Sequence, residues 1–211
     1  MCHHIVNKKL VEYVESMIIP RYADFDKGHN IEHVKTVIDE SLKLASQCNE
    51  KLEYAYVIAA YHDLGLCEGR ELHHIVSGKI LEADTRLSQW FSPDEIKLMK
   101  EAVEDHRASS KNPPRSIYGN IVAEADRDIV PLKIIKRTIQ YSMKNTPSPD
   151  KELHWRHLTE HMDEKYSENG YMKLWFENSK NAQRLKEFRT IISDTKLLRE
   201  IFEDLYSKEL C

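Results

Sequence analysis

The sequence contains little of what a β-sheet protein or a disulfide-stabilised protein requires. Glycine accounts for only six of the 211 residues, and no run of alternating β-branched residues is bounded by an Asn-Gly or Asp-Gly turn. The four cysteines are scattered and form no Cys-x-x-Cys pair, so we expect free thiols in a reducing compartment. These absences argue against a sheet protein, a disulfide framework and a zinc ribbon.

Long apolar segments and concentrations of one charge are also absent. No apolar stretch approaches the ~20 residues of a membrane-spanning helix, and the N-terminus lacks the pattern of a signal peptide. Charged residues make up 31% of the chain, but the net charge is only −4. We therefore expect a cytoplasmic protein that binds neither a membrane nor a nucleic acid polymer. A small phosphorylated substrate is still compatible with this net charge, because residues next to it can neutralise its phosphate.

Apolar residues recur at three- and four-residue spacing through almost the whole chain, which predicts an all-α protein. The expected helices cover about residues 5–19, 29–47, 52–62, 71–90, 93–106, 116–129, 131–144, 151–167, 171–179 and 182–206. A proline-containing loop at 145–149 is the best internal boundary. We nevertheless expect residues 150–211 to pack onto the preceding part, so that residues 1–211 form a single domain.

The segment with the clearest chemical content is Tyr61-His62-Asp63-Leu64-Gly65, which closes an apolar run. An imidazole and a carboxylate taken out of water need a partner, because their desolvation is costly. A metal ion is one such partner, and a hydrogen-bonded His-Asp pair in an ordinary core is the alternative. Both side chains can reach one ion only if the helix ends beside them, and Gly65 permits such an end.

Further histidines and an acidic residue surround this pair in the sequence. His29 and His33 lie four residues apart and share a helix face, which suits two ligands, or one ligand and one substrate contact, or an exposed polar face. Asp126 lies in an apolar helical segment and also needs a partner. Another stripe of histidines occurs at positions 154, 157 and 161, for which we prefer surface positions on a half-buried helix to a zinc cluster.

These motifs together resemble the HD-domain superfamily of metal-dependent phosphohydrolases, which is named for its His…His-Asp…Asp ligands. The segment around His33, the central pair His62-Asp63 and the segment Ala125-Asp126-Arg127 occur in the order of the family. The resemblance covers about residues 28–129. It implies an all-α, HD-domain-like helical bundle, with additional C-terminal helices over about 150–211.

The resemblance implies a metal site and its ligands, which are His33, His62, Asp63 and Asp126. Mixed nitrogen and oxygen ligation suits Mn, Fe, Co, Ni or Zn better than Mg. His74 fits a His-x-x-Ser-Gly pattern of the family, and His106 ends its helix as a similar family histidine does. In dinuclear branches these histidines bind a second metal, and in mononuclear branches they contact the substrate phosphate or a bound water. Both interpretations stay open.

Catalytic roles are expected for Asp63, His74 and His106. Many family members carry an arginine where this chain has Thr36, and some carry a lysine where it has Leu66. The resemblance therefore gives weaker support for a substrate-phosphate contact at these two positions. The candidate substrate-binding residues are therefore other cations and one histidine, namely His29, Lys35, Arg70, Arg107 and Arg127.

The resemblance implies a metal-dependent phosphohydrolase that acts on a nucleotide or another small phosphorylated metabolite. Two alternatives remain. One is a di-iron HD-type oxygenase, which the additional histidines permit. The other is a catalytically silent module that binds a metal or a nucleotide. The sequence leaves a homodimer open.

Overall fold

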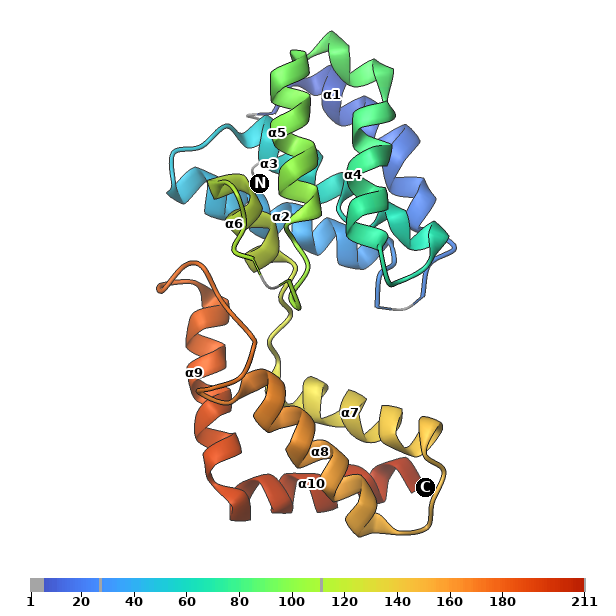
Figure 1. The fold of residues 1–211 in the computed structure, drawn as a ribbon, viewed down its shortest axis with the longest axis vertical. Coiled ribbons are helices and arrows are strands. Elements are labelled where there is room, and N and C mark those ends of the chain that lie inside the picture. Colours follow the sequence, from blue (N-terminus) through green and yellow to red (C-terminus); the bar gives the residue numbers. More distant parts are fainter. Residues whose placement is uncertain (1–5, 27, 111, 211) are drawn as a thin grey trace. The chain divides into compact units, whose positions relative to one another are not determined.

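The computed structural model describes residues 6–26, 28–110 and 112–210, and all regular elements among them are helices (Figure 1). This confirms the prediction of an all-α fold. Residue 5, the expected start of the first helix, lies outside the described residues. No helix in the described part of the chain has the length and apolar character needed to cross a membrane.

The chain divides into two compact units, Met1–Arg127 and Asp128–Cys211. The boundary falls before the helix at 131–145 rather than near residue 150, because that helix packs against the helices of the C-terminal unit. The expected single domain over residues 1–211 stays a prediction.

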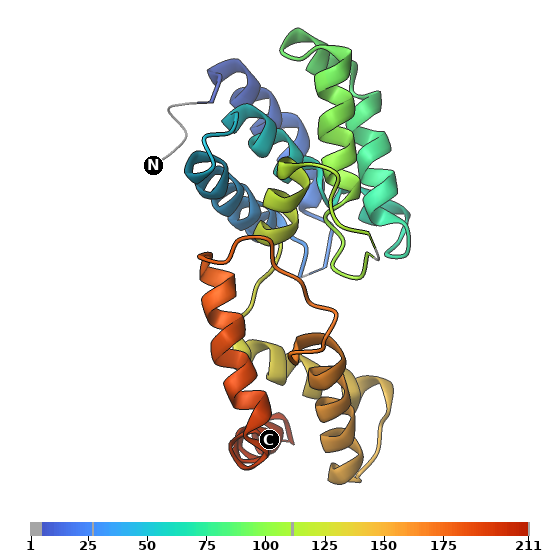
Figure 2. The ribbon, with the colours of Figure 1, turned by 60° about the vertical axis from the view of Figure 1, so that its left-hand side comes forward.

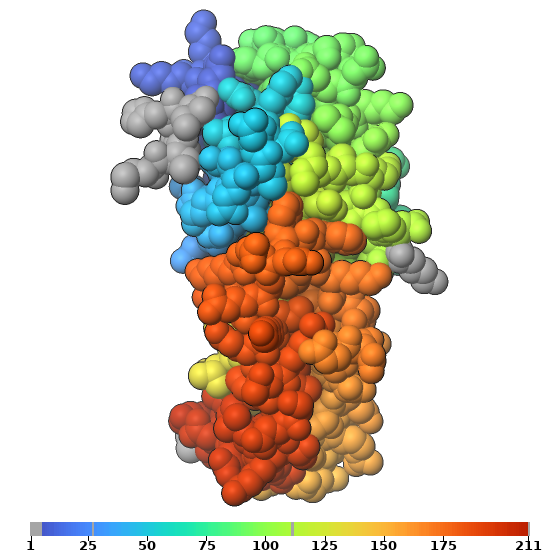
Figure 3. Space-filling view, turned by 90° about the vertical axis from the view of Figure 1, so that its left-hand side faces the viewer, coloured from blue at the N-terminus to red at the C-terminus, as the bar shows by residue number. Residues whose placement is uncertain are grey.

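The described residues of the first unit contain six α-helices. Their bounds are α1 (Lys8–Tyr13), α2 (Ile31–Gln47), α3 (Leu52–Tyr61), α4 (His73–Ala83), α5 (Pro93–Glu104) and α6 (Ile117–Ala125). A π-helical turn (Val14–Ile18) and a 3-10 turn (Ile19–Tyr22) extend α1, and two further 3-10 turns cover Leu64–Glu68 and Thr85–Gln89. In the space-filling view, the cyan surface around the start of α3 lies beside the yellow-green surface around α6 (Figure 3), and the Lys51 N–H donates to Tyr118 Oη of α6 at 3.0 Å.

Helix α3 is the centre of the first unit. Every residue from Tyr54 to Tyr61 is buried, and the helix packs against α2, α5 and α6. Such a helix is apolar on all sides, which explains why the sequence shows a continuous apolar run here rather than a one-sided stripe. Its C-terminal end therefore delivers His62 and Asp63 into the interior.

Gly65 has a different role from the one expected. Among the described glycines, only Gly69 adopts a positive φ, of 104°, so Gly65 does not close α3 through a left-handed conformation. A Cβ atom at Gly65 would instead lie 2.1 Å from the carbonyl oxygen of His73 and 2.6 Å from the backbone nitrogen of Ser77. The glycine lets the turn after α3 contact the start of α4 directly.

The expected helix at 71–90 is interrupted at Asp84. The Asp84 side chain accepts hydrogen bonds from the Arg86 backbone N–H and from the hydroxyls of Tyr13 and Tyr61. This polar junction ends α4 at Ala83 and starts a separate 3-10 turn. In contrast, the capping box expected at Ser92 and Glu95 is present and starts α5.

The second unit contains α7 (Pro131–Asn145), α8 (Lys151–Tyr166), α9 (Lys180–Ser193) and α10 (Thr195–Leu210), drawn from yellow to red in Figure 2. Ile135, Leu158, Phe188 and Phe202 are among the buried residues of its own apolar core. The expected helix at 171–179 is wrong, because this segment folds back on the end of α8 through backbone hydrogen bonds such as Tyr171 N–H to Glu164 O.

The sequence favours surface positions for all three histidines of α8, but the structure buries one of them. His154 is only 1% exposed, and its two ring nitrogens contact Ser142 Oγ at 2.7 Å and the Ser148 carbonyl oxygen at 3.0 Å. His157 Nδ1 also contacts Ser142 Oγ, at 2.8 Å. Ser142 therefore links α7 to α8, and both histidines take part in packing the unit.

Candidate metal centre

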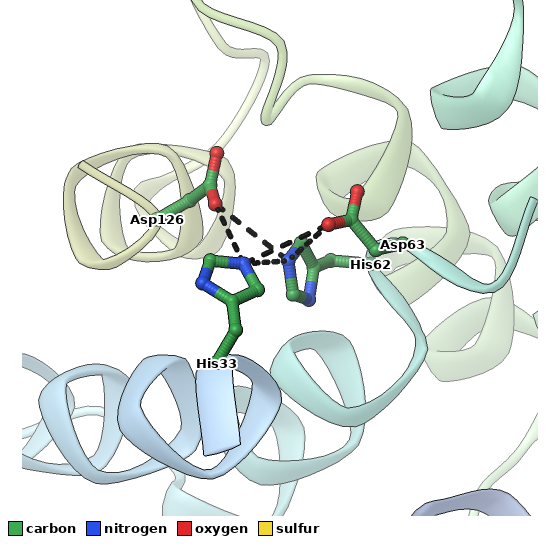
Figure 4. A group of neighbouring side chains, drawn as sticks. All are labelled: His33, His62, Asp63 and Asp126. Atoms are coloured by element: carbon green, nitrogen blue, oxygen red, sulfur yellow. Dashed lines mark hydrogen bonds and ion pairs between the residues drawn. The ribbon is translucent and has the colours of Figure 1, made fainter. Parts of the chain in front are cut away.

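The four expected metal ligands converge on one point in the first unit (Figure 4). His33 comes from the first turn of α2, His62 and Asp63 from the end of α3, and Asp126 from the end of α6. One ligand atom from each residue lies within 4.8 Å of the others. We call His33, His62, Asp63 and Asp126 the first ligand group.

The hydrogen bonding of His62 shows that this group suits a cation. His62 Nδ1 lies 2.7 Å from the Ala59 carbonyl oxygen, which can only accept, so Nδ1 carries a proton. In the neutral ring, Nε2 therefore presents a lone pair. This atom lies 3.2 Å from Asp63 Oδ2 and 3.4 Å from His33 Nε2. Ring nitrogens and carboxylate oxygens that face one another in this way match the ligands of a transition metal.

Short local contacts orient the members of the first ligand group. The Asn30 side chain caps α2 by accepting the N–H of His33 at 3.0 Å, which fixes the turn that carries His33. The fully buried Tyr22 accepts the backbone N–H of Asp63 at 3.3 Å and donates its hydroxyl to the Ala60 carbonyl at 3.0 Å. Tyr22 thus ties the residues at the end of α3 together.

Burial and charge act against each other in this group. Burial lowers the pKa of His33, but the carboxylates of Asp126 and Asp63 outweigh it and raise that pKa above its usual value. Burial also opposes the ionised form of Asp63, yet the neighbouring histidines, His62 first, hold the pKa of its carboxyl well below its usual range. The neighbouring imidazoles therefore keep the buried carboxylate of Asp63 ionised, while Asp126, with 21% of its side chain exposed, lies at the edge of the group.

A second group of ligand atoms lies on the other side of Asp63. Asp63 Oδ1 is 3.6 Å from His73 Nε2 and 3.5 Å from His106 Nε2, and the two ring nitrogens are 3.1 Å apart. The Nδ1 atoms of both rings donate to backbone carbonyls, so each Nε2 faces the group. We call Asp63, His73 and His106 the second ligand group. Asp63 contributes one oxygen to each group.

His74 does not belong to the second ligand group, which corrects the expected pairing of His74 with His106. Successive residues of a helix point about 100° apart, and His73, at the first position of α4, is the one directed at His106. Burial and the nearby charge of His106 lower the pKa of His74 to about 4, and its Nδ1 is buried without a hydrogen-bond partner among the described residues. The His-x-x-Ser-Gly alignment had selected the wrong neighbour.

The expected substrate-binding residues fall into two classes. His29 and the exposed Arg70 meet beside His33: Arg70 Nη2 lies 3.2 Å from His29 Nδ1, and both side chains contact the carboxylate of Asp26. The ring centroids of His29 and His33 are 5.8 Å apart. These residues form a polar rim next to the first ligand group.

The other three cations differ in exposure. Lys35 is exposed on α2, and Arg107 donates to the Glu71 carbonyl oxygen at 2.5 Å. The Arg127 side chain is buried, with 7% of its surface exposed, and it donates inward to Asp126 and to the His106 carbonyl. The guanidinium of Arg127 is therefore directed at protein groups rather than at solvent.

Comparison with known proteins agrees with the motif order. Residues 30–129 match the family model of the HD domain. The crystal structure of Bacillus subtilis YpgQ in complex with ADP aligns with a TM-score of 0.57 and 17% identity, over 93% of this chain and 95% of that chain. A predicted HD superfamily hydrolase from an uncultured Thermotogales bacterium aligns with a TM-score of 0.49 and 19% identity, over 74% and 87% of the two chains. No curated protein matches the chain. At 17% identity, the likeness to YpgQ shows the fold.

Proposed function

We propose that this chain is a metal-dependent phosphohydrolase, because residues 30–129 match the family model of the HD domain. The observation that carries the proposal is the convergence of His33, His62, Asp63 and Asp126, whose ligand atoms lie within 4.8 Å of one another. A divalent transition metal held there supplies Lewis acidity toward a phosphoryl oxygen and lowers the pKa of a coordinated water.

The chain's own residues contribute orientation and proton transfer. Asp63 presents Oδ2 to the imidazole of His62 and Oδ1 to that of His106, so one carboxylate bridges the two ligand groups. His73 and His106 place their Nε2 atoms where the neutral rings would serve as ligands of a second ion and the protonated rings as donors to a phosphoryl or leaving oxygen. In this proposal His106 has the catalytic role expected for it, and His73 has the role expected for His74.

A nucleotide or another small phosphorylated metabolite is the proposed substrate. The rim beside the first ligand group offers the guanidinium of Arg70 and the imidazole of His29, which suit a phosphate next to the reacting one. Arg107 and Lys35 are further candidate contacts. The similar fold of YpgQ, which was crystallised with ADP, supports a nucleotide.

A panel of phosphorylated compounds tests the proposal. Release of inorganic phosphate or pyrophosphate is measured for nucleoside mono-, di- and triphosphates and for sugar phosphates, each with Mn, Co, Ni, Fe or Zn. We expect metal-stimulated hydrolysis by the wild type and none by Asp63→Ala. Asp163→Ala, which changes an exposed residue on α8, is the matched control and should retain full activity. Equal activity of wild type and Asp63→Ala refutes the proposal.

The second ligand group favours one alternative, a di-iron oxygenase, because that chemistry needs two sets of ligands around a shared carboxylate. Metal analysis separates the two functions. Protein purified without chelators that is coloured, contains iron near two equivalents per chain and hydrolyses none of the phosphorylated compounds is an oxygenase rather than a phosphohydrolase.

A further inference from the structure

Arg127 lies between the two ligand groups. It follows Asp126 directly after the end of α6, and its side chain is 7% exposed. Nη1 donates to Asp126 Oδ2 at 3.1 Å, and Nη2 donates to the carbonyl oxygen of His106 at 3.0 Å. A single guanidinium therefore contacts one residue of the first ligand group and one residue of the second.

The contact with Asp126 determines which carboxylate oxygen faces the first ligand group. Oδ2 accepts from Arg127, while Oδ1 lies 3.3 Å from His33 Nε2 and 3.7 Å from His62 Nε2. Rotation of the carboxylate would break the bond to the guanidinium. Arg127 thus holds Asp126 in the orientation that presents one oxygen to an ion.

The contact with His106 determines where the end of α5 lies. The His106 ring is tied to that end because its Nδ1 contacts the Val103 carbonyl at 2.6 Å. Arg127 anchors the carbonyl of the same residue, so ring and backbone move together. The positive guanidinium also lies at the C-terminal ends of α5 and α6, where a helix favours a cation.

We propose that Arg127 is a positioning residue that couples the two ligand groups, so that both lose metal affinity when its guanidinium is removed. This inference rests on the proposed metal-dependent function. It assigns Arg127 an internal role in place of the expected substrate contact. A lysine cannot replace it, because a compact ammonium on a flexible stem does not reproduce two donors held in a rigid plane.

Cobalt binding tests the coupling without measuring activity. Metal-free protein is titrated with Co²⁺ by calorimetry, and the visible absorption of bound Co²⁺ is recorded in parallel. His33→Ala and His73→Ala identify which signal belongs to which group. Arg127→Met and Arg127→Lys are the test variants. Arg189→Met is the matched control, because Arg189 also donates to carbonyls at a helix end, those of Tyr166 and Ser167, but in the second unit.

We expect two equivalents in the wild type and in Arg189→Met. In both Arg127 variants we expect the affinities of both groups to fall by about 10–100-fold, the usual effect of losing a residue that orients ligands. Unchanged binding in folded Arg127→Met, or a loss confined to the first group, overturns the coupling. So does failure of both Arg127 variants to fold, which would make the arginine a purely structural residue.

The wild-type titration separates this inference from the proposed function. If the wild type binds one equivalent and His73→Ala changes nothing, the coupling is overturned while a mononuclear phosphohydrolase stands. If the wild type binds no Co²⁺ at all, both proposals fail.

Discussion

The hydroxyl of Tyr22 accepts a hydrogen bond from the backbone N–H of Asp63 at 3.3 Å, across 41 positions of sequence. The same hydroxyl donates to the Ala60 carbonyl, and burial, followed by the charge of Asp63, raises the pKa of Tyr22 well above its usual value. The phenol therefore stays protonated and holds the end of α3 in the shape that directs both His62 and Asp63 at the metal centre.

Tyr22→Phe removes this hydroxyl and leaves two buried backbone groups without their partner. We expect a loss of about 1–3 kcal/mol in the free energy of unfolding, measured in urea. We also expect weaker metal binding by the first ligand group. Tyr141→Phe, at an exposed tyrosine of α7, is the control and should change neither quantity. Unaltered stability in Tyr22→Phe contradicts the role given to the phenol.

Gly65→Ala places a methyl group against backbone atoms that cannot rotate away, the His73 carbonyl oxygen and the Ser77 nitrogen. We expect destabilisation by about 1–3 kcal/mol or more, and displacement of His73 from the second ligand group. Gly78→Ala, in the neighbouring helix α4, is the matched control, because the atoms nearest to its Cβ belong to the flexible side chain of Glu104 rather than to backbone. Thermal unfolding of both variants checks the difference, and equal melting temperatures contradict the prediction.

Arg70→Met removes the rim cation and keeps the aliphatic part of the side chain. If Arg70 contacts a substrate phosphate, KM rises by roughly 10–100-fold, the equivalent of one charge-assisted hydrogen bond, and kcat changes little. Arg86→Met is the control, because Arg86 lies over the Tyr13 ring rather than beside the metal centre. Steady-state kinetics on the best substrate of the panel provide the comparison. An unchanged KM removes Arg70 from the substrate contacts.

Glu95 links stability to pH through the start of α5. Its contacts with the Tyr54 hydroxyl and then the Ser92 backbone N–H lower the pKa of its carboxyl from 4.5 to about 2. The ionised form therefore stabilises the folded state. This contribution is complete above about pH 4.5 and is lost as the pH falls through about 2. Glu95→Gln should flatten the dependence of unfolding free energy on pH in this window, and a slope equal to that of the wild type contradicts it.

Sequence patterns predict the helical class, which the structure confirms, and they select four residues that the structure brings together as the first ligand group. The apolar run before His62 identified a buried helix, and motif order associated His33 and Asp126 with its end. The second ligand group was harder, because His73 and His74 are neighbours and the choice depends on the residue at which α4 begins. At that start Gly65 closely approaches the His73 carbonyl oxygen, a tertiary contact that sequence spacing does not reveal.

Tyr22 and Arg127 show why the supporting contacts could not be predicted. Tyr22 belongs to a segment that looked like the start of a polar loop, and its partners are about 40 residues away. Arg127 is a candidate substrate contact from the sequence, but its side chain is buried between the ends of two helices. Both residues act through tertiary contacts, and a single sequence gives no signal for these.

The most direct test of the metal centre is the metal content of protein purified without chelators or a histidine tag, compared between wild type and Asp63→Ala. The account predicts one or two equivalents of a transition metal per chain in the wild type and in Asp163→Ala. It predicts loss of that metal in Asp63→Ala, with the helical circular dichroism unchanged. Absence of metal from the wild type, even after reconstitution with Mn, Co, Ni, Fe and Zn, would contradict it and make the His-Asp pair structural.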